Sequence, residues 1–443
     1  MSKYTKEDIM NLVEEEDVEF IRLQFTDMAG MFKNVAITSS QLEKALNNDC
    51  MFDCSSVSGF FGLEESDLYL YPDLDTFTIF PWRPQQGKVA RLICDLYHSD
   101  RTPLESDGRH ILKKAIKEAE EMGYTFQVGP ECEFFLFHTD ENGLPTTITH
   151  EQAGFFDMSP LDFSENTRRD VVLTLEDMGY CVEASHHEKG ASQHEIDVRY
   201  DDALRTADTI MTLRMVVKTI AKHHGLHATF MPKPKTNECG SGMHINMSLS
   251  KDGKNIFAQT DGKNGLSREA YYFIGGLMKH VKGMCAITNP LINSYKRLVP
   301  GFEAPCNIVW SSKANNPIVR VPASRGESTR IELRSPDATC NPYLTLAACL
   351  FAGLDGIKNQ IEPPAELVED ISKLSRKEIE DRGIEFLPSD LYDAACAFRK
   401  SEIGDIVFGE KIKEIYYEKF MDIWREYEAQ VTEWEINSYL YKY

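Results

Sequence analysis

The chain has 443 residues, 42% of them hydrophobic, a length and composition that indicate two or three domains with well-packed cores. Its 70 acidic residues outnumber 48 lysines and arginines, and the net charge of -22 argues against general binding to nucleic acids or anionic membranes. We find no signal peptide, no run of about 20 apolar residues and no CxxC pair among eleven cysteines. We therefore expect a cytoplasmic protein with reduced thiols and no direct nucleic-acid or membrane partner.

The first hundred residues predict a small α+β domain, which we place at residues 1–103. Hydrophobic periodicity predicts helices and strands in alternation, including a hairpin that turns at Gly30. The helices are expected over 5–15 and 40–47, and the strands over 20–25, 33–37, 68–80 and 89–97.

The remainder, residues 104–443, predicts a larger α+β domain in which strands share one sheet and helices cover it. Beyond Pro363 and Pro364 we expect helix to the end of the chain. The earlier helices are expected over 109–122, 165–178, 203–224, 268–287 and 342–358, and the strands over 128–137, 226–231, 244–249, 318–321 and 329–334.

Two carboxylates interrupt the apolar strand predicted over 128–137. Because side chains alternate across a strand, Glu131 and Glu133 should face one side while Cys132 and Phe134 face the other. Buried carboxylates are costly unless they are paired, hydrogen-bonded or bound to metal. A metal site on this face is the leading hypothesis.

A second acidic stretch, SHHEKGASQHEIDVRY over 185–200, places Glu188 and Glu195 on either side of a flexible turn. On its own it is equally typical of a solvated acidic loop. For the histidines of this stretch, His186, His187 and His194, surface positions are favoured over metal ligation.

Two further stretches add ligand-binding character. In CGSGMHINMS, over 239–248, glycines permit close approach of a ligand, and a strand then presents His244, Asn246 and Ser248 on one face. In RVPASRGESTRIELR, over 320–334, four arginines surround Glu332, which shares its face with Arg334. The glycines also suit a plain turn, and the arginines also suit ordinary ion pairs.

Together these stretches describe a site for hard cations, phosphates and an anionic substrate. Oxygen ligands dominate, so Mg²⁺ or Mn²⁺ fits better than structural zinc. Metal ions with arginines are the usual apparatus of phosphoryl transfer. No GxxxxGK[ST] motif occurs, which argues against a P-loop fold.

In their order along the chain, these stretches resemble the glutamine synthetase family, type I, over essentially the whole length. The resemblance implies an N-terminal β-grasp-like domain and a C-terminal catalytic domain with a curved antiparallel sheet covered by helices. It also implies a dodecamer of two stacked hexamers with active sites shared between subunits. The motifs that carry it are MFDCSS at 51–56, GPECEFF at 129–135, SHHE and QHEID within 185–197, FMPKP at 230–234, GSGMH at 240–244, NSYKRLVPGFEAP at 293–305, and RVPASRG through IELR within 320–334.

The resemblance implies at least two Mg²⁺ or Mn²⁺ ions per site, with ATP as co-substrate. The implied ligands are Glu133, Glu188 and Glu195 for one metal, and Glu131, His244 and Glu332 for the other. The residues implied to contact phosphate or glutamate are Gly240, Arg297, Arg320 and Arg334, and those implied to hold the nucleotide are Glu183, Tyr200, Asn246, Ser248, Arg325 and Arg330. Asp53, from a neighbouring subunit, and Glu303 match residues that attract ammonium and accept its proton.

The activity implied is ATP-dependent ligation of ammonia to the γ-carboxylate of glutamate through γ-glutamyl phosphate, under a closing loop over 293–305. The chain departs from the family at Cys54, at Cys239 and at KGASQ over 189–193, where the family has VAPGQ. Gly62 stands where relatives often have a basic residue linked to feedback inhibition, so inhibition by glutamine should be weak or different. Residues 361–388 contain no tyrosine, which predicts no adenylylation.

Three alternatives remain open from the sequence. A γ-glutamyl amine ligase of the same superfamily would use a polyamine in place of ammonia. A catalytically silent metal-binding homologue would keep the fold without turnover, although the intact carboxylates and arginines argue against it. A two-metal hydrolase fits the carboxylates alone but would not explain the concentrated arginines.

Overall fold

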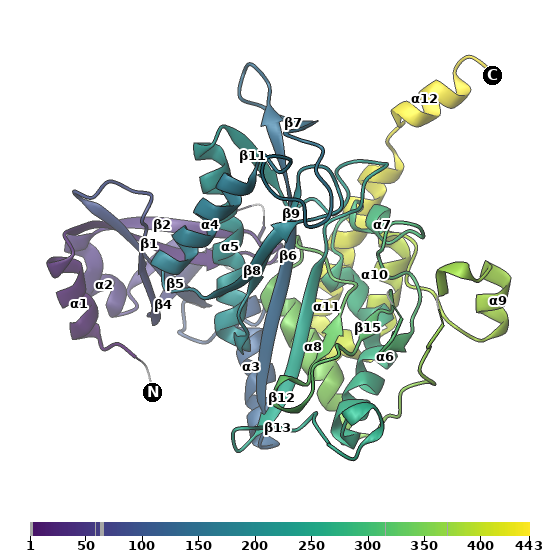
Figure 1. Cartoon of the computed structure of the whole chain (residues 1–443). Helices are drawn as coiled ribbons and strands as arrows, with labels where there is room; N and C mark the ends of the chain where they lie inside the picture. The colour runs from purple at the N-terminus through teal and green to yellow at the C-terminus, as the bar shows by residue number, and fades with distance from the viewer. Residues whose placement is uncertain (1–2, 58, 63–65, 315, 370) are drawn as a thin grey trace.

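The computed structural model describes residues 3–57, 59–62, 66–314, 316–369 and 371–443. Two sheets organise these residues, one of five strands in the N-terminal part and one of eleven strands in the remainder. Figure 1 shows the small sheet with its helices on one side of the molecule and the large sheet at its centre, with helices packed beside it.

The N-terminal sheet has the strand order β2-β1-β5-β4-β3, in which β1 and β5 are parallel and the other neighbours antiparallel. The predicted hairpin is present as β1 and β2. The elements are α1 (Lys6–Glu15), β1 (Val18–Thr26), β2 (Phe32–Thr38), the 3-10 helix η1 (Ser39–Gln41), α2 (Leu42–Leu46), β3 (Cys50–Asp53), β4 (Asp67–Ile79) and β5 (Lys88–Tyr97).

Local chemistry explains the ends of these elements. The Thr5 hydroxyl oxygen accepts a hydrogen bond from the Asp8 N–H, the Asp8 carboxylate accepts one from the Thr5 N–H, and this capping box begins α1. At the β1–β2 turn, Gly30 adopts a φ of +83° and a Cβ there would lie 2.9 Å from Cα of Asn341. Only glycine allows the hairpin to approach the second domain so closely.

The large sheet has the strand order β14-β15-β16-β12-β6-β9-β8, and β7, β10 and β11 pair with β6 while β13 pairs with β12. Its pairings are antiparallel except for β14 with β15. The strands are β6 (Thr125–Thr139), β7 (Pro145–Thr149), β8 (Val182–His187), β9 (Gln193–Val198), β10 (Asp201–Asp202), β11 (Leu226–Thr229), β12 (Met243–Lys251), β13 (Lys254–Asn255), β14 (Trp310–Ser311), β15 (Val319–Arg320) and β16 (Ile331–Leu333).

Helices supply the other half of the main core, and α8 is buried along almost its whole length. Among the described residues, no helix is long and apolar enough to cross a membrane. The helices are α3 (Gly108–Glu121), α4 (Glu165–Asp177), α5 (Ala203–His223), η2 (Lys263–Gly265), α6 (Arg268–Thr288), α7 (Ser294–Arg297), η3 (Gly326–Ser328), α8 (Pro342–Lys358), η4 (Ile371–Lys373), α9 (Arg376–Asp381), α10 (Leu391–Lys400), α11 (Glu402–Glu428) and α12 (Glu433–Tyr439).

Arg109, in the first turn of α3, joins the two domains. Its buried guanidinium contacts Asp73 of β4 at 2.7 Å and Asp95 of β5 at 2.8 Å. On the other side it contacts Asp208 of α5 at 2.8 Å, and the Tyr343 hydroxyl donates to the same carboxylate at 2.7 Å. One cation therefore compensates three carboxylates from both domains.

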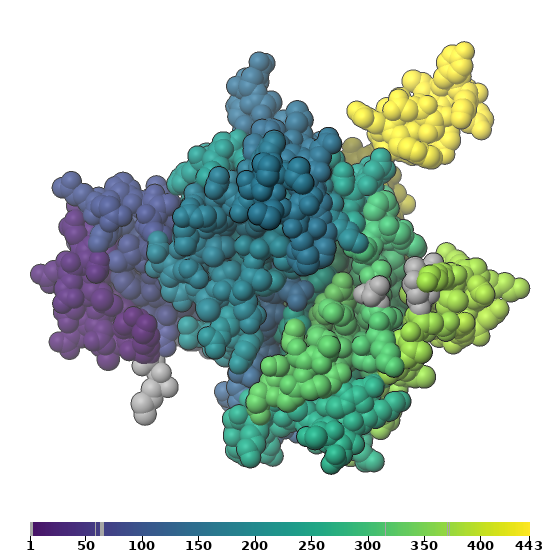
Figure 2. All heavy atoms as spheres, in the orientation of Figure 1, coloured from purple at the N-terminus to yellow at the C-terminus, as the bar shows by residue number. Residues whose placement is uncertain are grey.

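The C-terminal region differs from the expectation of helix to the end of the chain at residues 361–369 and 382–390, which form no helix. Residues 361–369 form neither helix nor strand, because Pro363 and Pro364 lack the N–H groups that a helix needs. Helices return after this segment, and α12 stands clear of the rest of the molecule, as Figures 1 and 2 show. The side chains of Trp434 in this helix and of Leu440, the residue after its end, are exposed.

Candidate active site

The paired carboxylates of β6 face one side of the large sheet, as strand alternation predicts. Glu131 and Glu133 both approach His244 of the neighbouring strand β12, at 3.0 Å and 3.8 Å. Cys132 and Phe134 lie on the opposite face and are buried in the main core. This prediction about facing is confirmed, and the two carboxylates belong to one site.

Glu131 shares its end of the site with Glu332 of β16. His244 Nδ1 lies 3.0 Å from Glu131 and 3.7 Å from Glu332, and these three residues could hold one metal ion. Burial opposes ionisation of Glu131, yet hydrogen bonds from His244 and Asn246 lower its pKa to about 2. The predicted trio of Glu131, His244 and Glu332 is therefore brought together.

Glu332 is fully buried and is held by two arginines. Arg320 Nη1 donates to one of its oxygens at 2.9 Å, and Arg334 donates to the other. Arg320 lies on β15, which pairs with β16, so the ladder itself sets this contact. The arginines thus form ion pairs with the site carboxylate, and they also bring positive charge to its edge.

The second predicted trio is arranged around Glu195. Glu195 forms one candidate metal group with Glu133 and His244, and another with Glu188 and His186. His186 Nε2 lies 3.1 Å from Glu195. The structure thus places Glu195 between Glu133 and Glu188, and it adds His186, which we did not predict as a ligand.

The carboxylates of this second group oppose one another's ionisation because they are buried close together. Burial and the charge of Glu133 raise the pKa of Glu188 to about 8. The pKa of Glu195 is raised well above its ordinary value by burial and by the same neighbour. Carboxylate oxygens with imidazole nitrogen suit Mg²⁺ or Mn²⁺, and a divalent cation would relieve the repulsion, so the residues fit the predicted metals.

The expectation of surface histidines is wrong for two of the three. His187 and His194 are fully buried, and His187 Nε2 lies 2.9 Å from the buried carboxylate of Glu151. Arg168 donates to His194 Nδ1 at 2.9 Å. These partners lie outside the 185–200 stretch, so the local polar composition gave no sign of them.

Sequence reasoning missed Gln193, the residue that fixes Glu133. Its side-chain amide donates to Glu133 Oε2 at 3.1 Å and to the carbonyl of Gly240 at 3.1 Å, and Gly242 N–H donates to Glu133 at 2.9 Å. A signal was present, because Gln193 and Glu195 share a face of β9 by alternation. The QHEID motif therefore supplies both a candidate ligand and its support.

A cavity of about 380 Å³ lies on one side of Glu131 and brings most of the predicted nucleotide residues together. Arg330 Nε donates to the Asn246 side chain at 3.0 Å, and Asn246 donates to Glu131 at 2.9 Å, so a chain of hydrogen bonds crosses the cavity wall. We call this space the nucleotide-side cavity. Its lining includes the predicted residues Glu183, Tyr200, Asn246, Ser248 and Arg330, and also Asp197, which we did not predict.

A second cavity, of about 340 Å³, is also lined by Glu131, and we call it the acidic cavity. At Gly240 a Cβ would lie 2.3 Å from the carbonyl oxygen of Pro232, so no other residue fits there. Arg297 is buried beside this cavity and donates to the carbonyls of Ser335 and Arg334. The predicted residues that line the cavity are Glu131, Glu133, Glu188, Glu195, Gly240, His244, Arg297, Glu303 and Arg334.

Among the predicted site residues, Arg320 and Glu332 line neither cavity but belong to the carboxylate cluster, whereas Asp53 and Arg325 lie outside both the cavities and the cluster. Asp53 is exposed at the end of β3 in the small domain, where Ser55 hydrogen bonds lower its pKa. Arg325 donates to the backbone carbonyls of Pro322, Ser324 and Asn264 and lines neither cavity. Within one chain, these two residues do not meet the carboxylate cluster.

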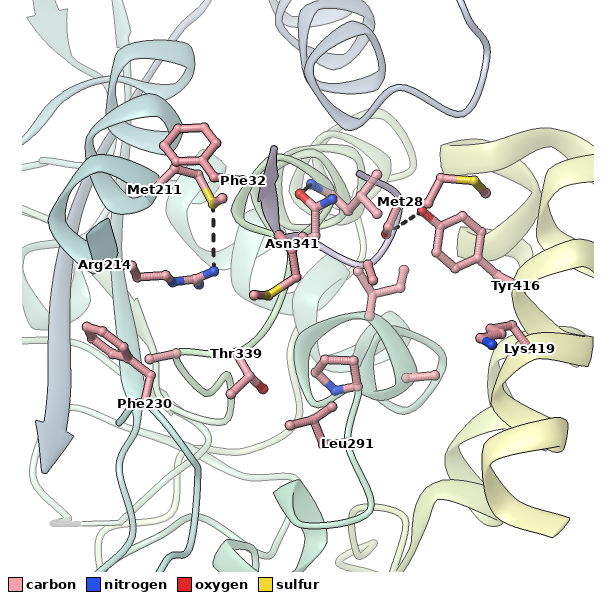
Figure 3. A pocket seen from close by; sticks show the side chains of 18 of the residues that line it. Met28, Phe32, Met211, Arg214, Phe230, Leu291, Thr339, Asn341, Tyr416 and Lys419 are labelled. Atoms are coloured by element: carbon pink, nitrogen blue, oxygen red, sulfur yellow. Dashed lines mark hydrogen bonds between the residues drawn. The ribbon is translucent and has the colours of Figure 1, made fainter. Parts of the chain in front are cut away.

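A further cavity, of about 440 Å³, lies where the β1–β2 turn meets α5 and α11 (Figure 3). Its lining is mainly apolar, and no aspartate or glutamate is found among the described residues that line it. The Tyr416 hydroxyl donates to the carbonyl of Met28 at its edge, at 2.9 Å. Although Arg214, Lys218 and Lys419 line this cavity, its described lining residues include no carboxylate that would hold a metal ion.

The fold and the site define a class of protein. It has two domains, and its large sheet presents clustered carboxylates, a histidine and arginines beside two polar cavities. Metal-dependent phosphate chemistry requires such a set of groups. The family model for the glutamine synthetase catalytic domain matches residues 105–439, and the model for the glutamine synthetase β-grasp domain matches residues 17–99. The chain belongs to the glutamine synthetase family.

Individual relatives agree with this assignment. The chain is 58% identical over 443 residues to glutamine synthetase of Clostridium saccharobutylicum, covering 100% of both chains. It is 53% identical over 441 residues to glutamine synthetase of Staphylococcus aureus (strain Mu50), covering 99% of both. Among solved structures, a GmaS/ADP complex has a TM-score of 0.88 at 31% identity, covering 98% of this chain and 99% of the other. Plasmodium falciparum glutamine synthetase also has a TM-score of 0.88, at 25% identity and 99% coverage of both.

Proposed function

We propose that the protein ligates ammonia to the γ-carboxylate of L-glutamate at the expense of ATP, giving L-glutamine, ADP and phosphate. The observation that carries this proposal is Glu131, which lines both the nucleotide-side cavity and the acidic cavity. Two reactants held in these cavities would meet at one strand of the sheet. Holding two reactants in the right relative orientation lowers the barrier to their reaction.

Divalent metal ions, Mg²⁺ or Mn²⁺, would be held by the two carboxylate groups already described. Glu131, His244 and Glu332 would hold the ion on the nucleotide side, and Glu133, Glu195 and Glu188 the ion on the glutamate side. When bound, such ions supply charge neutralisation and polarise phosphate and carboxylate oxygens. The crowding of unpaired carboxylates in the acidic cavity supports this assignment.

In the first step, a γ-carboxylate oxygen of glutamate attacks the terminal phosphorus of ATP, and the bond to ADP breaks. Arg320 and Arg334, at the edge of the carboxylate cluster, would offset the repulsion between carboxylate and triphosphate. Arg297 and Gly240 would position glutamate in the acidic cavity. The nucleotide-side residues, with Arg325 after a movement of its loop, would hold ATP.

In the second step, the nitrogen of ammonia bonds to the acyl carbon and the carbon–oxygen bond to phosphate breaks. Ammonium must first lose a proton, for which Glu303 at the acidic cavity and Asp53 are the proposed acceptors. Asp53 lies far from its own cavity in the small domain, so we propose that it serves a neighbouring subunit in a dodecamer of two stacked hexamers. The exposed apolar side chains of α12 would suit burial in such an assembly.

The test measures glutamine and phosphate formed from ATP, Mg²⁺ and glutamate, with either ammonium or a panel of amines. Ammonium-dependent formation of glutamine and phosphate in equal amounts is expected. Preference for an organic amine would point to a γ-glutamyl amine ligase and overturn the proposal. Absence of turnover with every amine would instead indicate a silent metal-binding homologue.

A further inference from the structure

An ion pair joins two residues that line the acidic cavity. Lys189 lies in the turn between β8 and β9, and its ammonium group contacts the carboxylate of Glu303. Glu303 belongs to the segment 298–305 that follows α7, which we call the 298–305 loop. Both side chains line the cavity although they are 114 residues apart in the sequence. The pair therefore joins the β8–β9 turn to the 298–305 loop, and both segments line the acidic cavity.

The turn that presents Lys189 is firmly anchored. Glu188 N–H donates to the carbonyl of Gln193 at 2.7 Å, and Ser192 N–H donates to Glu151 at 2.6 Å. Glu151 is buried and also contacts the buried His187, whose other ring nitrogen lies 2.6 Å from the carbonyl of Glu188. Lys189 thus extends from a fixed base that also carries a proposed metal ligand.

The 298–305 loop is held at a second point. The ring of Phe302 lies 3.4 Å from the ammonium group of Lys233, which is a cation–π contact. The base of the loop is tied to the same segment, because Lys233 N–H donates to the Asn293 side chain at 2.7 Å and Asn293 donates back to the Lys233 carbonyl at 3.0 Å. Two lysines from separate segments, Lys189 and Lys233, therefore hold adjacent residues of the loop.

The backbone of the loop needs such support. Glu303 has a φ of +62°, a left-handed conformation that a non-glycine residue adopts only when its surroundings hold it there. The hydrogen bond to Glu303 raises the pKa of Lys189, so this lysine keeps its charge well above neutral pH. The side chains of Lys189 and Glu303 are 46% and 52% exposed, so this pair can break and re-form as substrates enter.

We propose that Lys189 is a positioning residue that keeps the 298–305 loop over the acidic cavity and so protects γ-glutamyl phosphate from water. The inference rests on the proposed function and extends it to a residue that acts through its contact with Glu303. In the reaction to be prevented, a water oxygen bonds to the acyl carbon and the carbon–oxygen bond to phosphate breaks. Glutamate and phosphate result, with one water proton on phosphate and one released to solvent.

The test compares Lys189→Met, which keeps side-chain length without charge, with Lys189→Arg, which keeps the charge. Phosphate and glutamine are measured together in reactions with ATP, Mg²⁺, glutamate and subsaturating ammonium. An exposed ion pair changes a population by up to about fivefold, so Lys189→Met should raise the phosphate-to-glutamine ratio from one to about two to five. Lys189→Arg should restore a ratio near one.

Hydrogen exchange of the 298–305 peptide provides the second measurement, and it should be faster in Lys189→Met than in wild type. Lys358→Met is the matched control, because Lys358 forms an equally exposed ion pair with Glu118 away from both cavities. This control should leave both the ratio and the exchange unchanged.

Three results would overturn the proposal. The first is an unchanged ratio with unchanged exchange in Lys189→Met, and the second is faster exchange with a ratio that stays at one. The third is a ratio of one with a lower ammonium KM, which would mean that Lys189 competes with ammonium for Glu303. Wild-type protein without ATP turnover would refute the proposed function instead, while loop exchange would still report on the ion pair.

Discussion

Replacing Arg109 with methionine should loosen the junction between the two domains. Methionine fills a similar volume without charge, so the change removes the guanidinium while leaving little cavity. Asp95 keeps Lys113 as a partner and Asp73 is partly exposed, but among the residues that the structure describes the Asp208 carboxylate retains only the Tyr343 hydroxyl. Breaking a buried ion pair from one side costs about 3–5 kcal/mol, and we expect the free energy of unfolding to fall by that amount.

Equilibrium unfolding in urea, followed by circular dichroism at one fixed protein concentration, measures this change, because association alters apparent stability. Lys113→Met is the matched control, since it removes an exposed partner of Asp95 and should cost at most about 1 kcal/mol. The double variant Arg109→Met/Asp208→Asn should recover part of the loss. A loss below about 1 kcal/mol in Arg109→Met would refute the reasoning that three carboxylates depend on this cation.

Three other predictions concern the site. Glu332→Ala should reduce turnover by at least about 100-fold through loss of a metal ligand, with oligomer size unchanged by light scattering, and near-normal activity would exclude that role. Asp53→Ala should slow glutamine formation far more than formation of γ-glutamyl phosphate in single-turnover experiments, and equal slowing of both would contradict its assignment to ammonium. Glu188, with a pKa raised to about 8, is protonated at pH 7 and must lose its proton to bind metal. Mn²⁺ affinity measured by calorimetry should therefore rise by up to roughly tenfold per pH unit from pH 6 to 8 and level off above, whereas a flat profile would disprove this linkage.

Strand alternation explains why part of the site could be read from the sequence. The shared facing of Glu131 and Glu133, and that of Glu332 and Arg334, depends only on the two-residue period of a strand. The hairpin at Gly30 follows equally from local turn chemistry. In each case the side-chain positions are decided by residues close in the chain, so periodicity alone was sufficient.

Long-range pairing explains what the sequence could not show. The burial of His187 depends on Glu151, which lies 36 residues away in a segment with no strand pattern. The Arg109 cluster includes Tyr343 and Asp208, which are 135 positions apart in the sequence. Local composition cannot predict such partners, because they are set by how the sheets and helices pack.

The position of Asp53 shows a third limit. Its proposed role depends on a neighbouring subunit, and neither strand period nor the fold of one chain brings it to a cavity. Only the resemblance of the MFDCSS motif to the family suggests that role. The same holds for Arg325, whose contacts in this structure are to backbone carbonyls.

His244 links the two candidate metal groups through a single ring. Its Nδ1 faces Glu131 and its Nε2 faces Glu133. A neutral imidazole has one nitrogen with a free lone pair and one that carries a proton, so it can serve as ligand to only one of the two groups at a time. A metal ion bound to one ring nitrogen of His244 would therefore fix the proton on the other nitrogen, which faces the second group. By thermodynamic linkage, if ions occupied both groups through His244, the affinity for each ion would depend on the other to the same degree in both directions.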